Sequence, residues 1–433
     1  MIFTQFYFSR FVLRYENHDV SFFMKKLLIL FLFVSLHAPF SFGQETHNGN
    51  IKSIQLRPLT ENQFSAIVPL GTVLELSFDD LEADQKEYYY KVEHMTHDWK
   101  PSKILSNQYI DGFQSNIILD INNAFNTYQN YTHYSIKVPN INTVITKSGN
   151  YLLSVLNDID EVVFTRRFVL YENTATIGVA TSRSRNTKAY STDQTVQFSV
   201  NYPTLRINNP DQEIHVTVIQ NQNWNTAITD LKPQFFRKNQ LLYRYINKSN
   251  FKGGNQFLNF DNKIIRNKSM NIVKVERKEV YHNYLAPFER KDNPSYSYNP
   301  DINGQFVIRT LEGSDNNTEA DYAMMHFNLI SEKIPEKEVF VIGAFNNFKL
   351  NSENKMSFDP ENSSYNTNFL LKQGFYNYTF ATKDNSGAVS YGDILGNFSI
   401  TENEYTVIVY FKQIGGLFDR VIGVGNSYFT GER

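Results

Sequence analysis

Short segments in which apolar and polar residues alternate recur along most of the chain. Each segment is a few residues long and is bounded by Asn, Asp, Gly or Pro, the residues that favour turns. Alternation with a period of two places every second side chain on the same face of a strand. The segments expected to form strands include Val73–Phe78, Tyr88–Val92, Tyr151–Val155, Val162–Phe164, Arg167–Tyr171, Val196–Val200, Ile214–Ile219, Phe306–Ile308, Tyr376–Phe380 and Tyr405–Phe411.

This pattern favours one fold class. Apolar positions keep a period of 3.6 residues over no more than one or two turns, so helical bundles and doubly wound α/β folds are not expected. Short strands separated by turn residues are typical of β-sandwiches. The aromatic content of 15% fits this fold because Phe and Tyr favour half-buried strand positions. The sequence therefore predicts an all-β protein.

Two polar segments interrupt the strands and suggest domain borders. The first runs from Glu172 to Lys188, and the second, residues 331–337, is charged and contains Pro335. At about 150 residues per domain, the chain has room for three domains. We expect three consecutive β-sandwiches over residues 48–172, 173–330 and 331–433. The middle one contains a less regular region, residues 232–299, which predicts long loops of the kind that often carry binding function.

The beginning of the chain has the pattern of a secretory signal peptide. Two lysines precede the apolar run Leu27–Val34, and the small residues Ser41 and Gly43 precede Gln44. A basic start, a short apolar run and a small-x-small exit predict a signal peptide over residues 24–43, cleaved between Gly43 and Gln44. The apolar run is shorter than the roughly 20 residues that a membrane-spanning helix needs.

A methionine, Met24, stands directly before the basic pair. We therefore expect translation to start there and residues 1–23 to be an extension of the gene model. No later segment is apolar enough to span a bilayer as a helix. The mature chain is expected to be exported, with no membrane span of its own.

Composition and charge narrow the possible functions. The 42 Lys and Arg residues against 44 Asp and Glu give a formal net charge of −2, so the basic surface typical of a nucleic-acid-binding protein is not expected. The chain has no cysteine. This excludes disulfides, thiolate metal sites, cysteine nucleophiles and a lipid-modified N-terminal cysteine.

The residues His94, His97 and Asp98 lie close together and could suggest a metal site. On a strand, however, residues three apart point to opposite faces, so the two imidazoles would not converge. Zinc sites use three or four protein ligands, which this spacing does not supply. We expect Trp99 to pack and His94 or Asp98 to satisfy a turn, and we predict no metal ligand.

Other candidate groups also favour structural roles. Asp79 and Asp80 are adjacent, so on a strand they would face opposite sides, and we interpret them as a turn after Phe78. The aromatic cluster Tyr128–Tyr134 either covers a sandwich face, which we favour, or stacks on a sugar or a partner. The chain contains no Gly-x-Ser-x-Gly, His-Glu-x-x-His or phosphate-binding loop motif. We therefore predict no catalytic residue, cofactor or small-molecule substrate.

The C-terminal third contains the most distinctive local pattern. The strand and loop Val339–Phe348 are followed by a second strand segment, Lys372–Phe380. These segments resemble the early-set (immunoglobulin-like) sandwiches that include glycogen-binding modules. In those modules the loop usually ends in Trp, whereas here Phe348 stands at that place and the chain's two tryptophans, Trp99 and Trp224, lie elsewhere. The resemblance favours this fold for the last domain and leaves a carbohydrate-binding protein as the alternative function.

A set of motifs in fixed order extends over nearly all of the predicted mature chain. They are His94–Ser102, Tyr109–Phe113, Tyr131–Tyr134, Val138–Pro139, Ser148–Leu153, Asp321–Tyr322, Phe327–Leu329, Val339–Phe348, Lys372–Tyr378, Gly396–Phe398, Thr401–Tyr405 and Phe418–Gly423. Each motif alone is short, but the ordered set resembles the type IX secretion system plug proteins of Bacteroidota.

This resemblance implies a non-enzymatic protein. Members of the family are periplasmic, all-β, multi-domain plugs that associate with the very large outer-membrane translocon barrel, SprA, and seal its periplasmic opening. The implied partner is therefore an SprA-like barrel, and the implied location is the periplasm, at the outer membrane through that partner. The resemblance assigns no interface residue. Aromatic residues are enriched at interface cores, so exposed Tyr and Phe within residues 232–299 are candidate anchors, although they could equally cover the middle sandwich.

Overall fold

The computed structural model describes residues 49–60 and 62–431. The predicted extension 1–23, the signal peptide 24–43 and the cleavage position between Gly43 and Gln44 lie outside this range. The described residues are 49% strand and 3% helix, which confirms the predicted all-β fold. Among the described residues, no helix is both long and apolar enough to cross a membrane.

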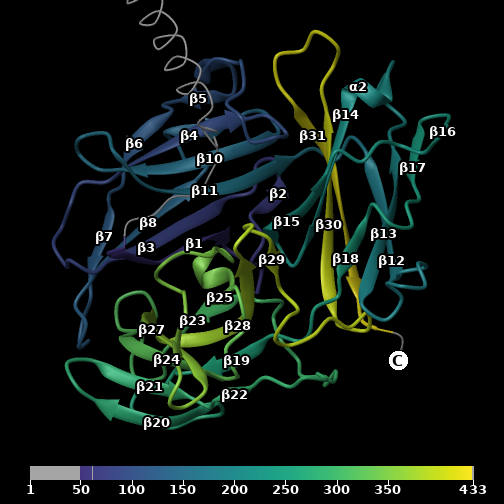
Figure 1. Cartoon of the computed structure of the whole chain (residues 1–433). Helices are drawn as coiled ribbons and strands as arrows, with labels where there is room; N and C mark the ends of the chain where they lie inside the picture. The colour runs from purple at the N-terminus through teal and green to yellow at the C-terminus, as the bar shows by residue number, and fades with distance from the viewer. Residues whose placement is uncertain (1–48, 61, 432–433) are drawn as a thin grey trace, which may run out of the picture. The chain divides into compact units, whose positions relative to one another are not determined.

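The N-terminal part forms a sandwich of two sheets (Figure 1). One sheet has the order β1 (Ile51–Pro58), β3 (Leu74–Asp80), β8 (Thr132–Val138) and β7 (Asp120–Asn123). The other has the order β2 (Ile67–Pro69), β11 (Val162–Tyr171), β10 (Gly149–Leu156), β4 (Tyr89–Met95) and β6 (Ser115–Ile117). A separate ribbon pairs β5 (Ile110–Gly112) with β9 (Thr143–Ile145). The apolar residues that alternate along these strands, such as Leu74, Leu76 and Phe78, form one buried core.

The second sandwich combines strands from two distant parts of the chain. One sheet has the order β12 (Thr176–Arg183), β13 (Asp193–Asn201), β17 (Gln240–Tyr243) and β16 (Phe235–Arg237), with β18 (Asn250–Lys252) also paired to β13. The facing sheet has the order β15 (Asn223–Thr229), β14 (Ile214–Gln220), β30 (Asn403–Phe411) and β31 (Arg420–Phe429). Figure 1 shows the yellow β30 beside the teal β14, and the two strands pair antiparallel from Ile214–Phe411 to Gln220–Tyr405.

The third sandwich lies in the chain between these two parts. One sheet has the order β19 (Leu258–Asp261), β28 (Gly374–Asp384) and β23 (Phe306–Ile308), with β25 (Lys337–Ile342) and β29 (Val389–Ser390) also paired to β28. The other has the order β20 (Ile272–Arg277), β21 (Tyr281–Leu285), β24 (Tyr322–Ile330), β27 (Ser364–Lys372) and β26 (Ser357–Asp359), with β22 (Phe288–Glu289) on β24. The short helix α2 (Pro210–Glu213) and two single 3₁₀ turns, η1 (Ser106–Gln108) and η2 (Ala344–Asn346), are the helical segments described.

Strand pairing crosses the predicted border at residue 331. Strands β19 and β23 lie before it yet pair with β28, and β14 lies before it yet pairs with β30. The third sandwich is therefore inserted into the second, and these two are not consecutive along the chain. Residues 232–299 also differ from the predicted long loops: they contain the short strands β16 to β22, divided between the two sandwiches.

Candidate functional site

The segment after β4 places the predicted His94, His97 and Trp99 at a junction between the first two sandwiches. Trp99 has a φ of 61° and is buried. Its ring lies 5.0 Å from that of Trp224 in an edge-to-face arrangement, and the Arg167 guanidinium stacks over it at 4.6 Å. The expectation that Trp99 packs is therefore confirmed, and both tryptophans of the chain serve this junction.

The two histidines of this segment point to different surroundings, and the predicted strand does not extend to both: His94 lies on β4, whereas His97 lies in the turn after it. His94 is buried, and its Nε2 lies 3.3 Å from the Ser148 carbonyl oxygen. Burial lowers the pKa of His94 to about 4. His97 instead lies beside Asp419: its backbone N–H donates to Asp419 Oδ2 at 2.8 Å, and its Nδ1 lies 3.1 Å from the same oxygen. Asp98 accepts from Thr96 and pairs with Lys100 at 2.8 Å, so it satisfies the turn.

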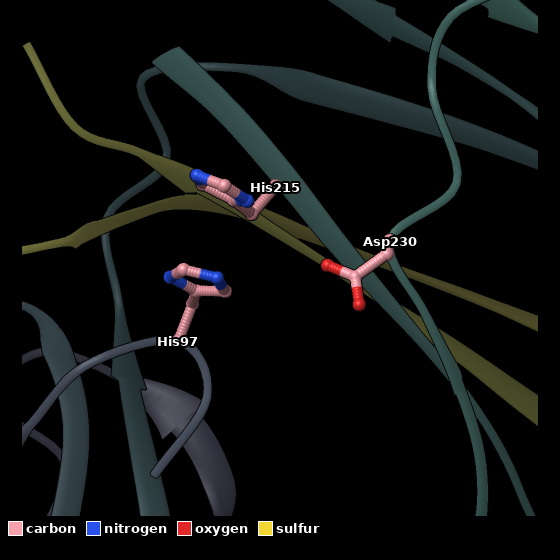
Figure 2. A group of neighbouring side chains, drawn as sticks. All are labelled: His97, His215 and Asp230. Carbon is pink, nitrogen blue, oxygen red and sulfur yellow. The ribbon is translucent and has the colours of Figure 1, made fainter. Parts of the chain in front are cut away.

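His97 belongs to a group that the sequence did not predict. His97 stacks on His215 of β14, with ring centroids 3.7 Å apart and an interplanar angle of 15°. Asp230, which directly follows β15, completes the group, and the potential ligand atoms of the three residues lie within 4.8 Å of one another. Figure 2 shows the Asp230 carboxylate pointing towards the two stacked rings. Imidazole and carboxylate groups at this separation are the donors of many divalent metal sites.

The surroundings of His215 favour the neutral form of its imidazole. Burial, together with the neighbouring His97, lowers the pKa of His215 to about 4. Burial opposes the charge of Asp419, yet the hydrogen bonds from His97 hold the pKa of Asp419 below its ordinary value. The Nδ1 atom of His215 is buried without a hydrogen-bond partner among the described residues.

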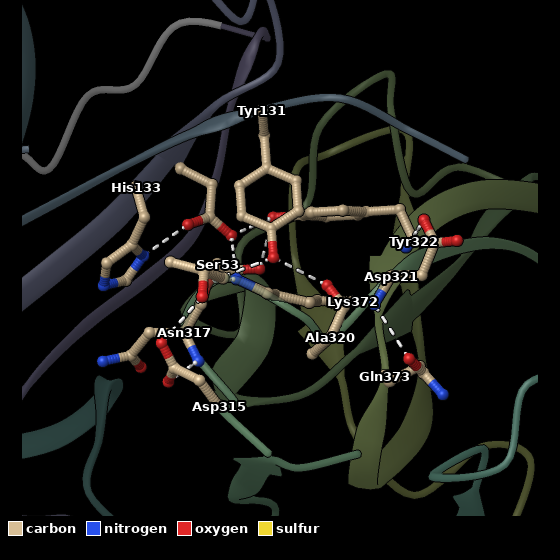
Figure 3. A network of polar contacts seen from close by, with 12 residues as sticks. Ser53, Tyr131, His133, Asp315, Asn317, Ala320, Asp321, Tyr322, Lys372 and Gln373 are labelled. Atoms are coloured by element: carbon tan, nitrogen blue, oxygen red, sulfur yellow. Dashed lines mark hydrogen bonds and ion pairs between the residues drawn. The ribbon is translucent and has the colours of Figure 1, made fainter. Parts of the chain in front are cut away.

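A second group, centred on Asp79, joins the first and third sandwiches (Figure 3). The Asp79 carboxylate accepts from Lys372 Nζ at 2.7 Å and from the Tyr322 hydroxyl at 2.6 Å, and it pairs with His133 Nδ1 at 2.6 Å. The Tyr322 hydroxyl also contacts Ser53 Oγ at 2.7 Å. Burial opposes the charge of Asp79, but the ion pair with Lys372 and the hydrogen bond with His133 hold its pKa below the ordinary value.

This arrangement corrects the interpretation of Asp79 and Asp80. The strand β3 continues through both residues, so no turn follows Phe78, and both carboxylates are fully buried. They do face opposite sides, because Asp79 contacts Lys372 whereas Asp80 pairs with Lys86 at 2.8 Å. A turn assignment supposes that the acids reach solvent, whereas a lysine neutralises each of them: the distant Lys372 for Asp79 and the nearby Lys86 for Asp80.

The aromatic cluster Tyr128–Tyr134 is mainly structural, as predicted. Tyr131 and Tyr134 are fully buried. The Tyr131 hydroxyl donates to the Ala320 carbonyl at 2.8 Å, and Lys372 Nζ lies 4.1 Å from the centre of its ring. Tyr128 is about half exposed, at 48%, and the Arg277 guanidinium stacks over it at 4.9 Å. Several motifs that carry the family resemblance therefore meet at the junction of the first and third sandwiches.

Phe348, which stands where the glycogen-binding modules carry a sugar-stacking Trp, is not accessible to a sugar. Phe348 is buried and packs near Phe257, with ring centroids 6.3 Å apart. A stacking platform must present one ring face to the sugar, which this Phe348 side chain does not do. The observation weighs against the carbohydrate-binding alternative.

A cavity of about 940 Å³ is lined by residues of all three sandwiches, including the β14–β15 turn and residues 347–351. Its lining contains the basic residues Arg57, Arg166, Arg167, Lys252, Lys349 and Lys383, with many asparagines. No acidic residue or histidine lines it among the described residues. The charged side chains of this lining are therefore all cationic.

The aromatic residues of 232–299 divide into buried and exposed ones, and only the exposed ones remain candidate anchors. Tyr243, Phe251 and Phe260 are buried in the sandwich cores. Phe235 and Phe236 are 54% and 56% exposed, on the edge strand β16. Adjacent residues of a strand point to opposite faces, so both faces of this edge present an aromatic ring to solvent.

Two comparisons with known proteins relate the chain to a protein family and to a solved structure. Residues 51–172 match the family described as the type 9 secretion system plug protein 1st domain. The chain is also similar to a hypothetical protein from Parabacteroides merdae ATCC 43184, whose crystal structure was determined at 2.30 Å, with 30% identity and a TM-score of 0.86. That similarity covers 90% of this chain and 99% of the other.

Two further solved structures are only remotely similar. The first is the B domain of a biofilm-associated protein, and the similarity covers 88% of this chain and 87% of that one. The second is the partial N-terminal region of an enterococcal surface protein, and the similarity covers 90% of this chain and 97% of that one. Both have 8% identity and a TM-score of 0.18, so they carry no argument about fold or function. No curated protein sequence matches the chain significantly.

Proposed function

The chain belongs to the type IX secretion system plug family, and from this membership we propose that it is a non-enzymatic plug subunit of the periplasm. In this proposal it binds the large outer-membrane translocon barrel, an SprA-like protein, and seals the periplasmic opening of that barrel. The observation that carries the proposal is the family match over residues 51–172, extended by a similar structure over 90% of the chain.

The way the sandwiches are joined supports this role. A plug must keep its shape against a wide pore, and a buried ion pair with its hydrogen bonds, Asp79 with Lys372, crosses one junction. At the other junction Glu172 pairs with Arg420, and Asn150 accepts from Tyr410 at 3.0 Å. The Asp79–Lys372 pair is buried on both sides, whereas Glu172–Arg420 is partly exposed. A small bend at the first junction would separate two charges that remain buried, which is costly. Rigid joints are thus available without disulfides.

The composition is compatible with docking to a large partner. A formal net charge of −2 leaves no strong field of one sign, so shape and apolar contacts would supply most of the recognition. The exposed pair Phe235 and Phe236 supplies one aromatic contact of the kind enriched at interface cores. The basic cavity lacks acids and histidines, which supports a binding protein rather than an enzyme.

A pull-down tests the proposal directly. A tag is added after Arg433, envelopes of the host are solubilised in mild detergent, and co-purifying proteins are identified. We expect an outer-membrane barrel of very large size in a fixed ratio to the tagged chain. The control is a tagged periplasmic protein of similar size from the same host. Recovery of the tagged chain without a barrel contradicts the proposal.

A deletion strain tests the sealing role separately. Loss of the gene should make the outer membrane more permeable to large antibiotics and detergents, and expression of the wild-type chain should restore the barrier. A strain that lacks both the chain and the barrel should be tight again, because the pore itself is then missing. Unchanged permeability in the single deletion would contradict the sealing role, even if the chain binds the barrel.

A further inference from the structure

His97, His215 and Asp230 form a compact set of metal-type donors that the plug role does not use. They come from three separate places in the chain: the turn after β4, the strand β14 and the residue after β15. Their potential ligand atoms lie within 4.8 Å of one another. Two imidazole nitrogens and one carboxylate oxygen are the ligand set that zinc and similar divalent transition metals prefer, whereas Ca²⁺ and Mg²⁺ prefer oxygen donors.

Asp419 fixes the orientation of the His97 imidazole. Its Nδ1 lies 3.1 Å from Asp419 Oδ2, which also accepts from the His97 backbone N–H at 2.8 Å. An imidazole held by a carboxylate at Nδ1 presents its Nε2 lone pair to the other side, which is the carboxylate–histidine–metal arrangement of many zinc sites. Asp419 itself is 1% exposed, so this support is part of the core.

The second imidazole also has a nitrogen without a protein partner. Within the described part of the chain, His215 Nδ1 is buried and makes no hydrogen bond. A buried polar atom without a partner costs about 1–3 kcal/mol unless something satisfies it. The two rings stack with centroids 3.7 Å apart, and the Asp230 carboxylate points towards them (Figure 2).

The separation is close to what a metal requires. Ligand atoms around a tetrahedral zinc ion at about 2.0–2.1 Å lie roughly 3.3 Å from one another. Donors within 4.8 Å must therefore approach one another by up to about 1.5 Å. One imidazole must also turn out of the stack, because the lone pairs of two nearly parallel rings lie in separate planes. Asp230 is exposed and both histidines are partly so, which leaves a route for an ion from solvent.

We propose that His97, His215 and Asp230 bind a divalent transition-metal ion of the zinc type, with Asp419 positioning His97. His97 belongs to the first sandwich, and His215 and Asp230 belong to the second. The ion would therefore clamp the junction between them and stabilise the chain, with a fourth position left for water. The role is structural, and it is independent of whether the chain seals a barrel.

The test uses the protein purified from the periplasm of cells that express the full-length chain. After treatment with EDTA, ZnCl₂ is titrated and followed by calorimetry, and thermal unfolding is recorded with and without the ion. We expect one zinc per chain and a higher unfolding midpoint with zinc. Cobalt should give the visible d–d absorption of a low-symmetry site. Absence of stoichiometric binding, or binding without any rise of the midpoint, overturns the proposal.

Zinc titration of single variants tests which side chains bind the ion. Asp230→Asn, an exposed substitution that leaves the core intact, and His215→Gln should each weaken zinc binding by about 100-fold or more, while Asp419→Asn should weaken it by about 10–100-fold. The matched control is His282→Gln with His326→Gln, which alters a histidine pair whose Nδ1 and Nε2 lie 2.8 Å apart in the third sandwich. The proposal fails if the control variant loses zinc binding or if Asp230→Asn keeps it.

Discussion

At the scale of single residues, the informative positions are those where a side chain meets a partner that is distant in the chain. Asp79, His97 and Gly149 lie in short local patterns that suggest turns or packing. Each has a second partner elsewhere: Lys372 for Asp79, Asp419 for His97 and His94 for Gly149. The local pattern alone determines which face of the strand a residue occupies, and the distant partner determines what the residue does there.

The Asp79–Lys372 pair predicts an unusual dependence of stability on pH. Replacing Lys372 with Met removes the lysine cation from a fully buried carboxylate and leaves His133 as its imidazole partner, which should cost about 3–5 kcal/mol of unfolding free energy at pH 7. In the wild type the pKa of Asp79 is lowered, so its contribution is present at neutral pH and is lost as the pH falls through the folded-state pKa. In the variant burial raises that pKa instead.

The deficit of Lys372→Met should therefore shrink between pH 7 and pH 4.5, because the variant takes up a proton on Asp79 before the wild type does. Urea unfolding at both pH values measures this difference. Lys91→Met, which removes a surface pair with Glu93 at 2.8 Å, is the control and should change stability little at either pH. An equal deficit at the two pH values would mean that the Asp79 charge is not what Lys372 compensates.

Gly149 allows the imidazole of His94 to pack against the start of β10. A Cβ atom at this position would lie 2.2 Å from His94 Nε2. Gly149→Ala should therefore cost about 1–3 kcal/mol in a urea unfolding experiment, because the buried ring must move. Gly178→Ala on β12 is the comparison, since its Cβ would meet only the rotatable Ser199 Oγ, at 3.1 Å. Equal costs for the two substitutions would argue against the steric explanation.

At the scale of the elements, the strands could be predicted and their partners could not. The period-two segments coincide with strands because alternation reports which face is buried, and β3, β10, β14, β28 and β30 all lie where the pattern places them. The same alternation says nothing about which strand lies alongside. The pairing of β14 with β30 is decided by long-range packing, and so the predicted border at residue 331 separates strands that belong to one sheet.

This pairing predicts the effect of a C-terminal truncation. A chain that ends at Phe398 lacks β30 and β31, so β14 loses a neighbour along its whole length. Hydrogen exchange should then become fast in residues 173–255, which lie far upstream of the cut, while β1 and β3 stay protected. A chain that ends at Phe429 keeps both strands and should exchange like the wild type. Unchanged protection of residues 173–255 would show that this half folds without its C-terminal strands.

The edge strand β16 predicts a contact with the partner. Replacing both Phe235 and Phe236 with Ala should leave the unfolding midpoint unchanged, since both rings are more than half exposed. Barrel binding should become about thirtyfold weaker, the effect of losing roughly 2 kcal/mol from two aromatic anchors. Phe113→Ala with Leu119→Ala, which removes two exposed side chains of the first sandwich, is the control. Equal loss in the control would mean that apolar exposure in general, and not β16, is responsible.

At the scale of the whole molecule, separate cores are linked by an additional apolar cluster and by buried pairs. The first sandwich has its own core, and so do the second and third. An additional apolar cluster joins β10 and β11 to β14, β30 and β31 through Leu152, Val169, Ile408 and Tyr410. Both faces of the sheet that contains β10 are therefore covered, which explains why this strand is buried throughout.

These links predict that the wild-type chain unfolds in a single calorimetric transition. The clusters and buried pairs at the junctions make it costly for one sandwich to open while the others stay folded. Scanning calorimetry of Tyr322→Phe, which removes the hydroxyl shared by Asp79 and Ser53, should show the third sandwich melting at a lower temperature than the first. Independent transitions already present in the wild type would contradict this coupling.

The donor group at His97 was beyond what the sequence could predict, for a geometric reason. His97 lies far along the chain from the β14–β15 hairpin that supplies His215 and Asp230, and the supporting Asp419 lies 322 positions from His97. Local spacing correctly excluded convergence of His94 with His97, yet it has no access to donors brought together by sheet packing. The family motifs did indicate the position, because His94–Ser102 and Phe418–Gly423 both belong to them.

The insertion of one sandwich into another has a consequence for the order of events during synthesis. The ribosome releases the chain from its N-terminus, so β12 to β18 emerge early, while β30 and β31 emerge last. The inserted sandwich can close once its own strands, β19 to β29, are available, but its host must wait with one edge of β14 unpaired. Completion of the host therefore requires that β30 and β31 have been synthesised. A chain that stalls before these strands keeps an unfinished second sandwich, which chaperones and proteases can recognise.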